Sequence, residues 1–230
     1  MAVGRRNPLI VALDTSEPRR AQDLAAALSG NVAFLKVGLE LFTAAGPSVV
    51  ERLREHAPVF LDLKLHDIPT TVGRAARNAG RLGPSLVTVH ALGGPDMVRA
   101  AVEGAERGST DVGFPPPTIL AVSVLSSVAG EGLASPASLA FESVAAGAGG
   151  VVASGEHVAE VRQAVGDAAL VVVPGVRPGS QPANDHVRIL SPGEALDQGA
   201  DLIVVGRPIT DAGDPSAAAR AVLREVGIGG

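Results

Sequence analysis

The sequence has no cysteine, no tryptophan and no tyrosine, and only five of its 230 residues are phenylalanine. Without cysteine, disulfide bonds and thiolate metal sites are excluded, which fits a reducing compartment. Because aromatic residues are so few, we expect a core of valine, leucine, isoleucine and alanine, the composition typical of parallel strands buried on both faces. No apolar run approaches the roughly 18 to 20 residues that a membrane-spanning helix requires.

The charge composition argues against a nucleic-acid partner. Lysine and arginine number 19 against 24 aspartate and glutamate residues, a net charge of −5, and the chain has no basic run of the kind that binds nucleic acid. Near the start of the chain, the apolar stretch 9–13 ends at Asp14 and is too short for the core of a secretion signal. We therefore expect a cytoplasmic protein that binds neither nucleic acid nor membranes.

Short apolar runs rich in β-branched residues recur along the whole chain. They occupy residues 8–14, 33–39, 59–65, 86–91, 118–125, 149–154, 169–176 and 202–208. Between them lie alanine-rich segments with a helical spacing of apolar residues, among them 19–30, 48–57, 97–108 and 159–167. Strands that alternate with helices favour parallel pairing, and eight such units are the number that closes a (β/α)₈ TIM barrel. We predict an α/β fold in which residues 1–230 form one TIM-barrel domain.

An open doubly wound sheet uses the same alternation and is the alternative. We prefer the barrel because eight repeats fill the chain and no G-x-G-x-x-G motif follows the first strand. The active site of a barrel lies at the carboxyl ends of its strands, and polar residues gather at the predicted ends. They are Asp14, Lys36, Asp62, Lys64, Asp67, His90, Ser123, Ser126, Ser154, Arg177, Gly206 and Arg207.

The stretch VFLDLKLHDIPTTV at 59–72 places three charged groups on or just after one strand. Side chains two apart in a strand point the same way, so Asp62 and Lys64 are expected to share a face. Asp67 lies two residues before Pro69, where the strand gives way to a loop. Charges at the end of a strand are common in catalytic sites. A buried structural ion pair is the alternative interpretation of Asp62 and Lys64.

Two later segments, PGVRPG at 174–179 and VVGRPI at 204–209, combine glycine with arginine after predicted strands. Glycine lets the backbone approach an oxyanion closely, and the guanidinium group supplies a planar fork of donors. In many barrels the loops after the seventh and eighth strands bind phosphate. A phosphorylated small molecule is therefore the expected ligand, and the alternative is a pair of turns with solvated arginines.

Taken together, DLKLHDIPTTV, the preceding LD and LKVG strands, PGVR and VVGRPI resemble the orotidine 5′-monophosphate decarboxylase family. The resemblance covers essentially the whole chain. It implies conversion of orotidine 5′-monophosphate to uridine 5′-monophosphate and CO₂ in pyrimidine biosynthesis, by a homodimer that needs neither a metal nor an organic cofactor. It also implies that Lys64 stabilises the transition state and donates the proton.

The resemblance assigns roles to individual positions. The reacting centre holds Lys36, Asp62, Lys64 and, from the other subunit, Asp67, while the substrate is bound by Asp14 at the ribose, Thr71 from the other subunit, Ser126 at the pyrimidine, and Arg177, Gly206 and Arg207 at the phosphate. One position departs from the family pattern. A glutamine that bridges phosphate and base in the family is replaced by His186, which either donates one hydrogen bond to the phosphate or is merely exposed.

Two other functions remain open from the sequence. Related barrels that act on sugar-acid and pentulose phosphates share the Asp-x-Lys strand but hold Mg²⁺ with a further carboxylate, whereas the second strand here carries Lys36, with Glu40 beyond its end. A barrel that binds a nucleotide without catalysis would need only the phosphate arginines. The complete set of Asp62, Lys64 and Asp67 argues against such an inactive barrel.

Overall fold

A computed structural model describes residues 7–123, 135–179 and 190–228. Its eight strands are all parallel, each pairs with the next along the chain, and β8 pairs with β1, so the sheet closes into a barrel. The strands are β1 (Leu9–Ala12), β2 (Phe34–Gly38), β3 (Val59–Leu65), β4 (Leu86–His90), β5 (Thr118–Val122), β6 (Gly150–Val152), β7 (Leu170–Val173) and β8 (Leu202–Val205). The predicted TIM barrel is confirmed, and the open sheet is excluded by the pairing of β1 with β8.

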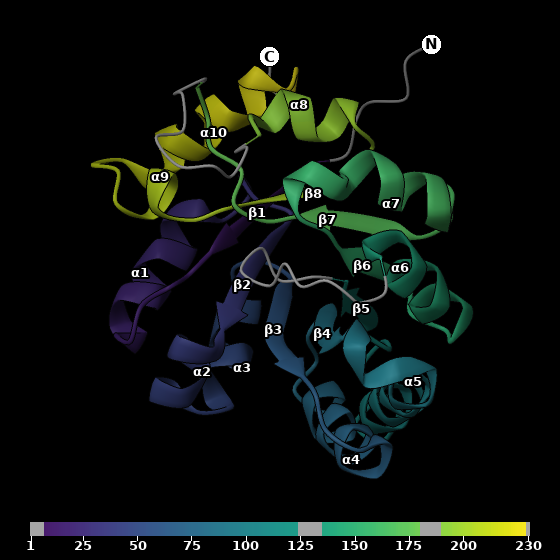
Figure 1. Cartoon of the computed structure of the whole chain (residues 1–230). Coiled ribbons are helices and arrows are strands. Elements are labelled where there is room, and N and C mark those ends of the chain that lie inside the picture. The colour runs from purple at the N-terminus through teal and green to yellow at the C-terminus, as the bar shows by residue number, and fades with distance from the viewer. Residues whose placement is uncertain (1–6, 124–134, 180–189, 229–230) are drawn as a thin grey trace.

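Helices surround the barrel (Figure 1). They are α1 (Pro18–Leu28), α2 (Leu39–Ala45), α3 (Ser48–Arg54), α4 (Pro69–Gly80), α5 (Gly94–Thr110), α6 (Pro136–Ala145), α7 (Val158–Val165), α8 (Pro192–Asp197), α9 (Arg207–Thr210) and α10 (Pro215–Glu225). Each of the predicted helical segments lies on one of them. In the part of the chain that the structure describes, no helix is long and apolar enough to cross a bilayer.

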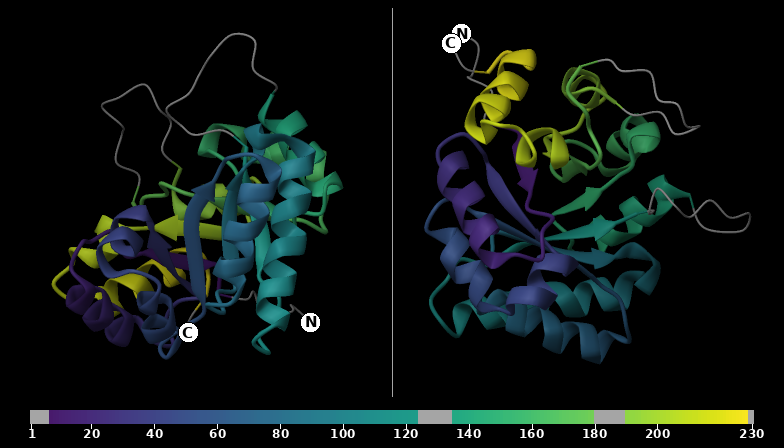
Figure 2. Two further views of the ribbon diagram at one scale, coloured as in Figure 1. Left: turned by 90° about the horizontal axis from the view of Figure 1, so that it is seen from below. Right: turned by 90° about the vertical axis from the view of Figure 1, so that its left-hand side faces the viewer.

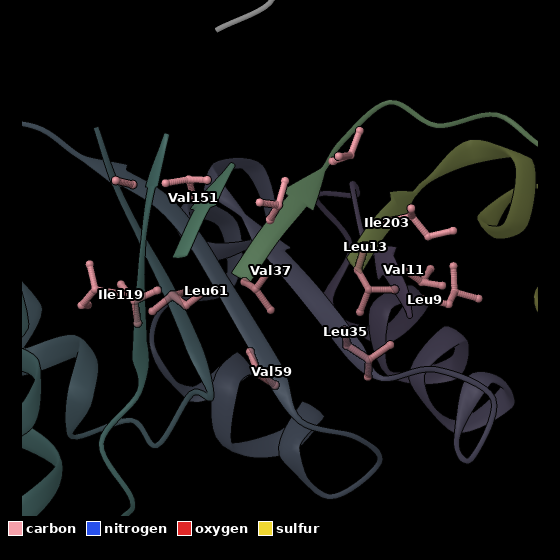
Figure 3. Close-up of a cluster of buried hydrophobic side chains, with 14 of the residues drawn as sticks. Leu9, Val11, Leu13, Leu35, Val37, Val59, Leu61, Ile119, Val151 and Ile203 are labelled. Atoms are coloured by element: carbon pink, nitrogen blue, oxygen red, sulfur yellow. The ribbon is translucent and has the colours of Figure 1, made fainter. Parts of the chain in front are cut away.

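Alternation along the strands separates two layers of core. In β3, Val59 and Leu61 belong to the outer cluster between sheet and helices, whereas Phe60 belongs to the cluster inside the barrel. Figure 3 shows the outer cluster, whose labelled side chains come from six strands and the residue that follows β1. Asp62 shares the inward parity of Phe60. The same packing that buries the strands therefore points Lys36 of β2 and Asp62 of β3 into the barrel.

The helices α4 and α5 pack side by side unusually closely, as Figure 2 shows along one flank of the barrel. Glycines allow this approach. A Cβ atom added to Gly104 would overlap the carbonyl oxygen of Gly73, and one added to Gly108 would overlap that of Arg77. Because α4 begins just after the loop that carries Asp67, this contact fixes the helix on which the loop rests.

We expect Gly104→Ala to destabilise the protein by about 3 kcal/mol, the upper part of the range for overpacking, because the obstructing atom belongs to the backbone of α4. The free energy of unfolding in urea is the measurement. Gly193→Ala in α8 is the matched control, since no atom lies within 4 Å of the added Cβ, and it should be neutral or stabilising by up to about 1 kcal/mol. Equal stabilities of the two variants would contradict the close contact between helices.

Candidate active site

A cavity of about 1130 Å³ opens at the carboxyl ends of the strands. Its floor is apolar and consists of inward-facing side chains of the barrel, namely Ala12, Phe60, Val122, Val152 and Val204. Its walls carry eight charged residues, namely Asp14, Lys36, Asp62, Lys64, Glu156, Arg177, Arg207 and Asp211. An apolar cavity with a few convergent polar groups is the usual form of a small-molecule site. The structure thus brings together eight of the residues that the sequence singled out, Ser154 and Gly206 among them.

Asp62 lies between the only two lysines of the sequence. The Lys64 Nζ atom donates to both carboxylate oxygens of Asp62, at 2.9 and 2.8 Å, and the Lys36 Nζ atom lies 3.7 Å from Oδ2. Lys36 also donates to Asp14 Oδ1 at 3.1 Å. The Asp62 side chain is only 11% exposed, so water and salt screen this array less than they screen surface charges.

The strand that carries the array is irregular at Lys64. Between the pairs Leu61 with Val87 and Leu65 with Val89, the register of β3 and β4 shifts. Lys64 has φ of 49°, the one positive value for a residue other than glycine in the ranges that the structure describes. Left-handed backbone is uncommon for lysine and is often found at functional sites. The lysine is therefore presented by a bulge and not by a regular strand.

Asp67 and Thr71 do not line the cavity of their own chain. Asp67 lies in the loop between β3 and α4, where its Oδ1 atom accepts a hydrogen bond from the Ile68 N–H at 2.7 Å. Thr71 lies in the first turn of α4, and both side chains are exposed. Between them, Ile68 is 66% exposed. The expected contribution of Asp67 and Thr71 to the site of a second subunit stays a prediction.

The two arginines lie on the part of the cavity wall formed after β7 and β8. The Arg177 backbone N–H donates to the Leu190 carbonyl at 3.1 Å, while its side chain is exposed. Gly206 directly precedes α9, and Arg207 is the first residue of that helix. A Cβ on Gly206 would lie 3.7 Å from Asp14 Oδ2, so the bare backbone lies next to that carboxylate. Donors suited to an oxyanion thus line the same cavity as the lysines.

Behind the array, His90 stacks on His66 with ring centroids 5.1 Å apart and an angle of 20° between the planes. The Nδ1 atom of His90 accepts a hydrogen bond from the Leu92 N–H at 3.3 Å. Burial, and then the electrostatic interactions with His66 and Lys64, lower the pKa of His90 below the ordinary value of 6.5. A neutral His90 therefore avoids adding a third cation beside the two lysines.

Because folding lowers the pKa of His90, the unfolded chain binds a proton there more readily than the folded chain does. We expect no effect of His90 on stability above the unfolded pKa, near pH 6.5, and a loss of stability as the pH falls from there toward the folded pKa. Urea unfolding across pH 5 to 8 measures this. His90→Asn keeps an acceptor for the Leu92 N–H but cannot titrate, so its profile should be flatter, and a profile as steep as that of the wild type would contradict the assignment.

Two predicted site residues, Ser126 and His186, lie outside the described residues. Ser123 is buried and its hydroxyl donates to the Val152 carbonyl at 3.2 Å, whereas Ser154 lines the cavity. The sequence reasoning missed Thr88, which contacts both Asp62 and Lys64. A signal was present, because Thr88 is a polar residue of an apolar strand and has the same inward parity as His90.

Two of the four acidic side chains that line the cavity contact a lysine. Oxygens of Asp14 and Asp62 contact lysine Nζ atoms. Among the residues in the described ranges, no group of three histidine, cysteine, aspartate or glutamate side chains could hold a metal ion. The array of Asp14, Lys36, Asp62 and Lys64 offers two ammonium groups and two carboxylates above an apolar floor, a set that can stabilise a developing negative charge and transfer a proton.

Comparison with known proteins identifies the family. The model of the orotidine 5′-phosphate decarboxylase / HUMPS family matches residues 7–222. Proteins named orotidine 5′-phosphate decarboxylase from Anaeromyxobacter dehalogenans and Thermobifida fusca are 51% and 46% identical to the chain, and the alignments cover 93% and 95% of it and 96% and 95% of those proteins. The crystal structure of orotidine 5′-phosphate decarboxylase from Lactobacillus acidophilus has a TM-score of 0.83 at 38% identity, with 96% of this chain and 99% of that one covered. The chain therefore belongs to the orotidine 5′-phosphate decarboxylase / HUMPS family.

Proposed function

We propose that the protein is a carboxy-lyase that converts orotidine 5′-monophosphate to uridine 5′-monophosphate and CO₂ in pyrimidine biosynthesis. The names of relatives that match over nearly the whole chain support this activity. The observation that carries it is the contact of Lys64 Nζ with both oxygens of Asp62, in a cavity that also holds Arg177 and Arg207. We take residues 1–230 as one decarboxylase domain that acts in the cytoplasm.

The reaction needs fixed positive charge. When the bond between C6 and the carboxyl group breaks, CO₂ leaves and the electron pair stays on a vinylic carbon that has no adjacent carbonyl to delocalise it. We propose that the Lys64 ammonium faces this carbon, stabilises the negative charge as it develops, and then transfers one proton to it. Lys64, left neutral, regains its proton from solvent. Side-chain charge alone does this work in the proposal, without a metal or an organic cofactor.

The carboxylate of Asp62 acts on the bound substrate, whose energy it raises before the bond breaks. Placed near the carboxylate of the substrate, it repels that group in the ground state, and the repulsion disappears as CO₂ leaves. Lys36 contacts both Asp62 and Asp14, and these contacts hold the two carboxylates in fixed positions. Its 12% exposed side chain has little freedom to leave this position. Asp14 binds the ribose in this proposal, since it is the most exposed member of the array.

The phosphate is assigned to Arg177, Gly206 and Arg207. Two observations support this assignment. The three residues line the same cavity as Lys64, and Gly206 has no side chain, which leaves its backbone open to an oxyanion. Because the phosphate is remote from the breaking bond, its binding energy can serve to orient the reacting end of the substrate. Ser126 at the pyrimidine and His186 at the phosphate complete the proposed binding set.

We also propose a homodimer in which Asp67 and Thr71 reach the cavity of the partner. Both are exposed beside the strand that carries Lys64, and neither lines the cavity of its own chain. The exposed side chain of Ile68 between them offers apolar surface that a second copy would cover. Delivered from the partner, Asp67 would add a second carboxylate near Lys64.

The proposed activity is tested by mixing the purified protein with orotidine 5′-monophosphate. We expect the absorbance of the orotate ring to fall while CO₂ is released in equal amount. A barrel that only binds nucleotides would leave orotidine 5′-monophosphate unchanged. It would still bind uridine 5′-monophosphate, as measured by equilibrium dialysis. Binding without release of CO₂ would refute the proposed function.

A further inference from the structure

We propose that Thr88 is a positioning residue for the decarboxylation, and that its buried hydroxyl sets the relative placement of Asp62 and Lys64. The inference rests on the proposed function. Thr88 lies in the middle of β4, is fully buried, and does not line the cavity. It therefore cannot touch the substrate and can act only through the two residues that it contacts.

The first contact involves the backbone. Leu61 pairs with Val87 and Leu65 pairs with Val89, so three residues of β3 lie opposite the single residue Thr88. Regular ladder bonds cannot form across this mismatch. The Lys64 N–H donates instead to the Thr88 hydroxyl oxygen at 2.9 Å. The hydroxyl thus takes the place of a strand carbonyl and holds Lys64 in its left-handed conformation, with φ of 49°.

The second contact involves the carboxylate. The Thr88 hydroxyl donates to Asp62 Oδ1 at 2.8 Å. A hydroxyl has one proton and two lone pairs. Because one lone pair already accepts from the Lys64 N–H, the proton is free to point at Asp62, and the two bonds together fix the orientation of the hydroxyl. One oxygen atom is therefore linked both to the backbone that carries the proposed proton donor and to the carboxylate beside it.

The hydrogen bond from Thr88 to Asp62 persists when the ion pair between Lys64 and Asp62 weakens. In the ground state, Lys64 Nζ itself contacts both oxygens of Asp62. Once Lys64 has given its proton to the carbon, the charge that attracts the carboxylate is gone, whereas the bond from Thr88 remains. Water cannot replace this bond, because Thr88 is completely buried. The array is thereby restored to its geometry for the next turnover.

The test compares Thr88→Val, which keeps the shape and removes the hydroxyl, with Thr88→Ser, which keeps the hydroxyl. We expect Thr88→Val to lower kcat by about 10²-fold, the effect of misplacing reacting groups by about 1 Å. KM should stay within about threefold, because the phosphate residues follow other strands. Thr88→Ser should recover most of kcat. If Thr88→Val does not fold, Thr88→Ala takes its place.

A second readout does not depend on activity. Since the chain has only two lysines, protein labelled with ¹⁵N at lysine Nζ gives two side-chain signals, which a Lys64→Arg variant assigns. Thr88→Val should shift the Lys64 signal, and Thr88→Ser should not. An unchanged kcat or an unchanged Lys64 signal in Thr88→Val, or a Thr88→Ser variant as impaired as Thr88→Val, would overturn the proposal. A shifted Lys64 signal in a protein whose wild type releases no CO₂ would refute the proposed function and leave the positioning by Thr88 standing.

Discussion

Replacing Lys64 by alanine is expected to lower kcat for decarboxylation by about 10⁴-fold or more. The variant loses electrostatic stabilisation of the carbanion, worth about 10²- to 10³-fold for one aligned group. It also loses the proton donor, worth about 10²- to 10⁴-fold. In addition, Asp62 loses a partner that contacts both its oxygens and stays as a largely buried carboxylate beside the substrate carboxylate. Steady-state or single-turnover release of CO₂ measures the effect.

Binding should survive this change. The phosphate arginines follow β7 and β8, whereas Lys64 belongs to β3, so uridine 5′-monophosphate should bind Lys64→Ala with an affinity within about tenfold of the wild type. Arg99→Ala is a matched control, because it removes one positive charge from an exposed ion pair with Asp96 on α5, outside the cavity. Turnover of Lys64→Ala close to that of Arg99→Ala would show that Lys64 is not the acid.

Replacing Arg207 by alanine should act on binding and leave most of the chemistry intact. A hydrogen bond to a charged group contributes about 1.5 to 3 kcal/mol, and about 1.4 kcal/mol corresponds to tenfold, so we expect KM to rise by about 10- to 150-fold. At saturating substrate, kcat should fall much less, because Lys64 and Asp62 keep their contacts. Initial rates over a range of orotidine 5′-monophosphate concentrations give both constants.

The phosphate itself provides the control for Arg207. Arg207→Ala should weaken the binding of uridine 5′-monophosphate but not the binding of uridine, which lacks the phosphate group. Arg220→Ala on α10, which removes an exposed arginine that contacts Ser216, should change neither affinity. Equal losses for nucleotide and nucleoside in the Arg207 variant would assign the arginine to the ribose or the base, and not to the phosphate.

Most of the barrel follows from local patterns in the sequence. The run 59–65 coincides with the strand Val59–Leu65, because a short apolar run is typical of a parallel strand that is covered on both faces. The predicted strand ends were less accurate. The run 202–208 ends at Val205 as a strand, since Arg207 already begins α9. The contact of α4 with α5 was also not predictable, because glycine in a helix weakens it unless a neighbour requires the space.

The candidate site was predictable to the extent that parity and strand ends determine it. Alternation in β3 places Asp62 inside the barrel, and pairing brings Lys36 of β2 next to it. The bulge at Lys64 was not predictable, because it depends on a hydroxyl from another strand. Parity places Thr88 of LVTVH at 86–90 inside the barrel. Because threonine is also a common β former, the strand alone does not show that Thr88 contacts two charged residues.

The central claim is that side-chain charge alone drives the loss of CO₂. The most direct test is the rate of CO₂ release from orotidine 5′-monophosphate by wild-type protein that has been treated with a chelator and assayed without added metal. We predict the same rate before and after this treatment, and no increase on addition of Mg²⁺. Loss of the activity on chelation and its return with Mg²⁺ would contradict the claim and assign the chemistry to a metal-dependent reaction of the same fold.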